Sequence, residues 1–334
     1  MIKSILTYSV SFFILFYGVY NIQTFINGNR SFEVDFKRFS FDETKHINEF
    51  IDYEHFKTKK QRIQKLFKKE NPLSLLKSKS NNGYLKIEDS TSNVYKIRVS
   101  DYKNNESWIT ININGKKPKL DNEVTLKTTP YLVKANETTN LKKEKISVDF
   151  DKNTFYEDFY IDFDVKNDTL TLHKDIIPAK KRFNITYNID SYTNPDKNKL
   201  YIARLVGYKK YPYYTSTKRK GNLLVARTKT LGTYALAVDT IQPTIVNHNF
   251  KKEQWMSKYR YLKVKINDKG GSGISNYRAT VNGKWILMEY DYKTKILTHD
   301  FNDGVITDTK NNLKVIVTDN VGNNSTFETL FYRK

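Results

Sequence analysis

Two β-hairpin signatures near the C-terminus constrain the fold of this chain more than any other feature. Asn282-Gly283 separates two alternating segments, and Asn-Gly favours a tight type I′ turn because both central residues take a positive φ. Residues 313–317 also alternate, so their apolar side chains point to one face. That segment ends in an Asp-x-x-Gly-Asn turn at Asp319. Both signatures predict antiparallel strands.

The same two signatures occur near the N-terminus. Asn27-Gly28 follows an alternating segment, and Asp101 with Asn105 follows another. Gly28 and Asp101 are 73 positions apart, whereas Gly283 and Asp319 are 36 apart, so the first copy contains 37 additional residues. We therefore predict that the first segment repeats the last one and carries an insertion.

The additional residues have a helical pattern. Ser40 and Glu43 have the spacing of a capping box, and apolar residues follow at helical intervals. These features predict a helix over about 41–69, broken near Tyr53, and Asn71-Pro72 ends it. Strands are predicted to resume at 84–87 and 94–99.

The rest of the chain has strand patterns separated by turn residues. The alternation is clearest at 146–150, 159–165, 183–187 and 200–205. The predicted fold class is all-β, with three β-sandwich (Ig-like) domains in tandem, the first with a helical insertion. The predicted domains are an incomplete sandwich at 21–118, a sandwich at 122–240 and an Ig-like sandwich at 241–334.

Residues 1–20 form a separate apolar segment. One lysine precedes an apolar run, which resembles a signal peptide or signal anchor, although the run is short for a membrane-spanning helix. The third domain has room for two strands upstream of Ser272, but the first has too few residues before Tyr17. Two interpretations stay open. Either residues 5–16 are an anchor or a replacement strand, or the chain is the tail of a longer protein.

Composition excludes several classes of function. The net charge is +21, which suits an anionic partner, but the lysines are spread along the chain, as in a composition bias. No nucleic-acid-binding motif is present, so we expect no nucleic-acid partner. Cysteine is absent, which excludes disulfides, thiolate zinc sites and cysteine nucleophiles.

The sequence offers no catalytic, cofactor-binding or metal-binding motif. None of the five histidines forms a His-x-His or His-Glu-x-x-His motif, and no P-loop is present. The positions of Asp268, Asp319 and Asn320 suit calcium ligands at one end of a sandwich, and ordinary turn chemistry is the competing explanation for these residues. We therefore predict no catalytic residue, no cofactor and no metal ligand.

Aromatic side chains of the last domain provide the one candidate ligand surface. Trp255, Trp285, Tyr290 and Tyr292 have rings on which sugars can stack. Core packing is the competing explanation for the same residues.

Three segments carry a resemblance to a known family: residues 231–236, 282–290 and 317–323. They resemble the C-terminal non-catalytic β region of flavobacterial lysostaphin-type (LytM-like) zinc metallopeptidases, and the resemblance extends from Tyr17 to Lys334. In that family a catalytic domain precedes this region. It binds zinc through a His-x-x-x-Asp pair and a His-x-His motif and cuts peptidoglycan cross-links. Neither motif occurs here, so no catalytic residue is carried over.

The resemblance implies a non-catalytic accessory or binding region of a cell-wall (peptidoglycan) metallopeptidase-family protein. Its expected place is the cell envelope, after export to the periplasm or outer membrane, with membrane contact through residues 1–20. The implied partners are peptidoglycan or a partner envelope peptidase. Two alternatives stay open: the C-terminal fragment of a split or mis-started endopeptidase gene, or a membrane-anchored adhesin-like protein.

Overall fold

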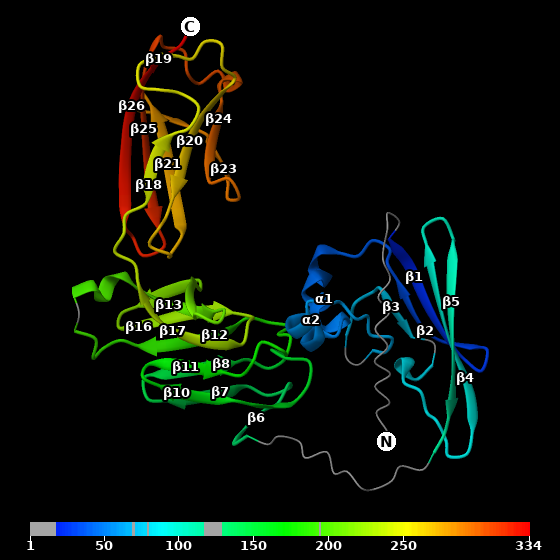
Figure 1. Ribbon diagram of the computed structural model, residues 1–334. Helices are drawn as coiled ribbons and strands as arrows, with labels where there is room; N and C mark the ends of the chain where they lie inside the picture. Colours follow the sequence, from blue (N-terminus) through cyan, green and yellow to red (C-terminus); the bar gives the residue numbers. More distant parts are fainter. Residues whose placement is uncertain (1–17, 69–70, 79, 117–128, 194) are drawn as a thin grey trace.

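The computed structural model describes residues 18–68, 71–78, 80–116, 129–193 and 195–334. The chain is all-β and Ig-like, and Figure 1 shows three β domains that follow one another along the sequence. The predicted fold class is therefore confirmed. The predictions about residues 1–17 lie outside the described residues. Within the described part of the chain, no helix is long and apolar enough to cross a membrane.

The first domain contains one five-stranded sheet in the order β3-β2-β1-β4-β5. Its strands are β1 (Val19–Ile26), β2 (Asn29–Asp35), β3 (Leu76–Ser78), β4 (Ser92–Asp101) and β5 (Glu106–Asn114). Its helical turns are η1 (Phe41–His46), α1 (Ile47–Phe50), α2 (Tyr53–Lys59) and η2 (Asn81–Gly83).

The second domain contains two five-stranded sheets, β10-β11-β17-β13-β14 and β15-β16-β12-β8-β7, and the pair β6-β9. Its elements are β6 (Tyr131–Val133), β7 (Thr139–Lys143), β8 (Ile146–Phe150), β9 (Phe159–Ile161), β10 (Phe163–Lys166), β11 (Thr169–Leu172), β12 (Phe183–Asn188), η3 (Pro195–Lys199), β13 (Leu200–Val206), β14 (Tyr211–Tyr214), β15 (Thr217–Lys220), β16 (Leu223–Thr228) and β17 (Gly232–Val238). Three of the four predicted alternations form single strands here, and the fourth, 159–165, forms two strands, β9 and β10, which belong to different sheets.

The third domain is a sandwich of the sheets β18-β20-β24-β23 and β19-β26-β25-β21-β22. Its elements are β18 (Thr244–Asn247), β19 (Gln254–Trp255), β20 (Tyr261–Asn267), β21 (Ile274–Val281), β22 (Lys284–Ile286), β23 (Glu289–Asp291), β24 (Ile296–Asp300), η4 (Phe301–Asp303), β25 (Lys310–Asp319) and β26 (Asn324–Tyr332). Leu262, Val264, Val315 and Val317 are fully buried between the two sheets.

The repeat predicted from the two Asn-Gly turns is present in the backbone. Asn27 and Gly28 have φ values of 49° and 83°, and Asn282 and Gly283 have values of 48° and 80°. These positive values belong to type I′ turns. Each asparagine also uses its side-chain oxygen to accept a backbone amide from the strand that pairs with the first strand of its hairpin. The donors are Val94 in β4 and Asn312 in β25, at 2.8 Å in both copies. The two turns therefore have the same structure, although the first hairpin has a bulge between Thr24 and Phe25 that the second lacks.

The strand that pairs with each hairpin repeats as well. β1 pairs with β4, and β21 pairs with β25, and each ladder has one irregularity. It lies between Val19 and Asn21 in the first copy and between Ile274 and Asn276 in the second. An irregularity at equivalent positions shows that the repeat extends from the turn along the length of this ladder.

The predicted helix over 41–69 is only partly correct. The Glu43 carboxylate accepts the Ser40 amide at 2.9 Å, as expected at the predicted N-terminus. Helical structure ends at Lys59, because Lys60 takes a left-handed conformation with φ 62°. Beyond it, Gln64 forms a β-bridge with Ile51 instead of continuing a helix. The break near Tyr53 is present, since α2 begins there.

The predicted strand at 84–87 is wrong, and β3 forms at Leu76–Ser78 instead. β3 pairs with the outer side of β2 and extends the sheet. The insertion then covers this sheet: Phe50, Leu73 and Leu75 are buried with Phe32 and Val34. Among the described residues of this domain there is no second sheet. The core therefore lies between the one sheet and the insertion.

Candidate functional site

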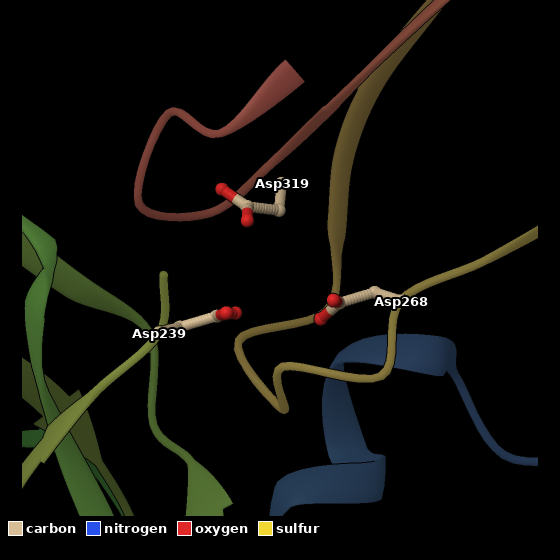
Figure 2. A group of neighbouring side chains, drawn as sticks. All are labelled: Asp239, Asp268 and Asp319. Atoms are coloured by element: carbon tan, nitrogen blue, oxygen red, sulfur yellow. The ribbon is translucent and has the colours of Figure 1, made fainter. Parts of the chain in front are cut away.

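Three aspartates converge where the second domain meets the third (Figure 2). Asp239 follows β17, Asp268 follows β20, and Asp319 ends β25. One carboxylate oxygen of each lies within 4.8 Å of an oxygen of the other two. The group therefore joins residues of two strands of the third domain to the segment that leaves the second.

Backbone amides fix the orientation of Asp239 and Asp268. Asp239 accepts the amides of Ile241 and Ser272, each at 3.0 Å. Asp268 accepts three amides of the glycine-rich turn that follows it, at 2.9, 3.2 and 2.6 Å. Gly270 allows this turn to lie against Asp239. A Cβ at this position would lie 1.6 Å from an Asp239 oxygen, so only glycine fits here.

Asp319 is held by its own turn and is tied to Asp239. It accepts the amides of Val321 and Asn323, at 2.9 and 2.8 Å. The Asn323 side chain donates to Asp319 at 2.7 Å and to the backbone carbonyl of Asp239 at 2.8 Å. Asn323 therefore links the end of the second domain to the third.

The cluster concentrates negative charge in a buried place. Asp239 and Asp319 are 1% and 2% exposed, and Asp268 is half-buried. Within the described residues, no lysine, arginine or histidine forms an ion pair with any of the three. Burying unpaired charge is costly. Chemically, the arrangement offers a set of hard oxygen donors, the kind that divalent cations such as Ca²⁺ take.

The sequence suggested Asp268, Asp319 and Asn320 as neighbours at one end of a sandwich, although no metal ligand was predicted. Asp268 and Asp319 do converge. The Asn320 amide group instead donates to the carbonyls of Ser272 and Gly273, at 2.8 and 3.1 Å. Asp239 was missed, although an acidic residue at the last strand of one domain, just before a short link to the next, is a usable signal.

The four aromatic candidates do not form one platform. Trp255 lies in β19 and Trp285 in β22, which are the opposite edges of one sheet. Trp255 stacks on Tyr332, with ring centroids 5.3 Å apart. Tyr290 is partly buried against Tyr277, and burial raises the pKa of its hydroxyl.

Two of the four candidates, Trp285 and Tyr292, have exposed side chains and lie near each other in the sequence. Trp285 is 58% exposed and Tyr292 is 72% exposed, and Leu287 between them is 54% exposed. Trp285 lies in β22, Leu287 follows that strand, and Tyr292 follows β23. These two strands are edges of the two sheets of the third domain. We call Trp285, Leu287 and Tyr292 the edge patch.

Two histidines and one of the acidic residues of the second domain have ordinary structural partners. His46 lies 2.9 Å from the Tyr156 hydroxyl, and His55 lies 3.2 Å from Gln61. Asp164 forms an exposed ion pair with Lys143 at 2.5 Å. Across the described ranges, the aspartate group at the junction is the only place where three or more His, Asp or Glu ligand atoms converge.

Comparison with known proteins finds one domain family. Residues 130–239, which are 110 of the 334, match the Zu5-like domain family. This range begins just before β6 and ends at Asp239, so it coincides with the second domain of the structure. No curated protein matches the chain.

Several solved structures are similar in part. One is an endo-β-1,4-mannanase from Thermotoga petrophila (11% identity, TM-score 0.24), of which the chain spans 20%, with 29% of the chain covered. Others are the fibronectin(III)-like modules of Clostridium thermocellum CbhA (12%, TM-score 0.23, covering 46% of the chain and 86% of the modules) and Bacteroides ovatus SGBP-B (9%, TM-score 0.18, covering 94% and 60%). Likeness at these TM-scores does not bear on function.

Proposed function

We propose that this chain is a non-catalytic binding region of a cell-wall peptidase-family protein, located in the cell envelope, with peptidoglycan as its ligand. The resemblance of residues 17–334 to the accessory region of LytM-like peptidases supports the class of protein. The edge patch is the observation that carries the binding role, because it exposes the ring of Trp285 on the edge strand β22 and the ring of Tyr292 in the turn after β23.

The chemistry of the edge patch suits a glycan. A tryptophan or tyrosine ring combines an apolar face, against which the C–H groups of a sugar pack, with a polar tip that stays in water. Exposed apolar side chains that gather in one place commonly mark interaction sites. The net charge of +21 adds a long-range attraction to an anionic wall polymer.

The test is retention of the full chain on purified peptidoglycan in a sedimentation assay. The double variant Trp285→Ala with Tyr292→Ala should lose most of the retention. The matched control is Tyr208→Ala, which removes a fully exposed ring from the second domain and should bind like the parent protein. Absence of retention by the parent, or equal loss in the control, would contradict the proposal.

The non-catalytic part of the proposal has its own test. The protein is incubated with zinc and peptidoglycan, and soluble muropeptides are measured. We expect no cleavage, because neither zinc motif of the family occurs in the sequence. Zinc-dependent release of muropeptides would overturn the assignment as a non-enzyme.

A further inference from the structure

We propose that Asp239, Asp268 and Asp319 form a binding site for a divalent cation of the Ca²⁺ class, which fastens the second domain to the third. The proposal is independent of the binding role of the edge patch. It rests on two observations: three carboxylates converge with no basic side chain paired to them among the described residues, and the buried hydroxyl of Ser272, whose amide donates to Asp239, lacks a partner.

Turn chemistry alone does not explain the convergence, because the chain contains the same turn without it. Asp101, the counterpart of Asp319, accepts the amides of Lys103 and Asn105 and the Asn105 side chain, at 2.8, 2.9 and 2.8 Å. In the described part of the chain no group of ligand atoms forms around Asp101. The turn is therefore complete with one carboxylate, and it does not by itself bring Asp239 and Asp268 to Asp319.

Ser272 supplies the second observation. It is fully buried, and its hydroxyl has no hydrogen-bond partner within the described residues. Its amide donates to Asp239 and its carbonyl accepts from Asn320, so the residue is held among the acidic groups. A buried hydroxyl without a partner costs free energy. A cation, or a water bound to it, would supply the missing partner.

The spacing and the type of the donor atoms select the class of ion. Ca²⁺ binds six to eight oxygens at about 2.3–2.6 Å, so two ligands on one ion lie up to about 5 Å apart. The carboxylate oxygens here lie within 4.8 Å of one another. No nitrogen or sulfur ligand takes part, which disfavours zinc. Asp268 is half-buried, which leaves a side open for water ligands and for entry of the ion.

The position of the site defines its effect. Asp239 belongs to the segment that leaves β17, whereas Asp268 and Asp319 belong to the third domain. Without an ion, the described cross-links at this point include the bond from Asn323 to the Asp239 carbonyl and one from Lys199 to the Val321 carbonyl, at 2.8 and 3.3 Å. A cation bound by all three carboxylates would add a strong link and limit bending between the domains.

The test is calorimetric titration of the EDTA-treated full chain with CaCl₂ and, separately, with MgCl₂. We expect one bound Ca²⁺ per chain and weaker binding of Mg²⁺, which demands a stricter octahedral site. Asp268→Asn and Asp319→Asn should each weaken Ca²⁺ binding at least about tenfold, since each removes one of three charged ligands. Asp101→Asn, the matched change in the repeated turn, should leave binding unchanged.

A thermal measurement keeps the test decisive if a variant folds poorly. The quantity compared is the rise in Tm between EDTA and CaCl₂, which cancels any loss of stability common to both conditions. The parent and Asp101→Asn should show the rise, and Asp268→Asn should not. No heat of binding and no rise in Tm at roughly 10 mM CaCl₂, above the range of extracellular calcium modules, would overturn the proposal. Equal loss in Asp101→Asn would do the same.

Discussion

Replacing Asn323 by alanine should destabilise the third domain far more than the matched change Asn105→Ala destabilises the first. Both asparagines end the repeated turn and donate a side-chain bond to its aspartate, at 2.7 Å for Asn323 and 2.8 Å for Asn105. They differ in burial and in one further bond. Asn323 is 7% exposed and also donates to the Asp239 carbonyl, whereas Asn105 is exposed.

The expected magnitudes follow from this difference. An exposed hydrogen bond that water can replace contributes about 0.5–1.5 kcal/mol, which is the expected cost of Asn105→Ala. Asn323→Ala leaves two buried acceptors without a donor, and each costs about 1–3 kcal/mol. The expected loss is therefore about 2–6 kcal/mol. With a urea m-value of about 1–2 kcal/mol per molar, even the lower bound moves the midpoint by about 1 M or more.

Tryptophan fluorescence can separate the two domains in this assay. The chain has three tryptophans, and only Trp108 lies in the first domain. In a Trp108→Phe background, urea unfolding followed by fluorescence reports on Trp255 and Trp285 of the third domain alone. The first domain is followed in a Trp255→Phe, Trp285→Phe background. All measurements are made in EDTA, so that cation binding adds nothing to the midpoints.

Equal losses for the two variants would refute the reasoning, because they would show that Asn323 gains nothing from its buried place and its bond to Asp239. A large loss for Asn105→Ala would refute it too, since the exposed turn would then carry stability that its hydrogen bonds do not explain.

Two further predictions concern the junction and the insertion. Gly270→Ala would place a methyl group 1.6 Å from an Asp239 oxygen and should cost about 1–3 kcal/mol in urea unfolding, whereas Gly18→Ala, which meets nothing within 4 Å, should be near neutral. Burial first, and then Lys180 and Lys45, lower the pKa of His46, so the unfolded chain binds the proton more readily than the folded one. The free energy of unfolding should therefore fall as the pH drops from 6.5 through the lowered pKa, and urea midpoints above and below pH 6.5 should show less of this fall in His46→Gln.

The parts of the fold set by short-range chemistry were predictable from the sequence. The Asn27-Gly28 and Asn282-Gly283 turns require positive φ, and alternation identifies the strands on either side of them. The end of α2 was not predictable in this way. Gln64 donates its side-chain amide to the Phe50 carbonyl at 3.0 Å, and this contact between distant residues holds the segment after Lys60 out of a helix. Helical spacing of apolar residues contains no information about that contact.

The candidate site shows the same limit. Asp268 and Asp319 could be paired because both follow alternating strands, whose ends meet at one end of a sandwich. Asp239 belongs to another domain, and only the angle at which the link leaves β17 brings it to the other two. The unsatisfied hydroxyl of Ser272 is likewise a property of packing, since the sequence shows only a serine in a glycine-rich turn.

Comparison of the repeated turns at Asp101 and Asp319 distinguishes the residues that form the turn from those that form the proposed cation site. In both copies the fourth residue of the turn has a positive φ, 64° at Asn104 and 82° at Gly322, and the aspartate accepts the same three donors. The turn is thus a structural motif that serves either domain. Among the described residues, three carboxylates converge only at Asp319, where the end of the preceding domain adds Asp239 and the loop after β20 adds Asp268. An Asp-x-x-Gly-Asn turn should therefore predict a cation site only when the preceding domain ends in an acidic residue, and this combination is what distinguishes the second junction of the chain.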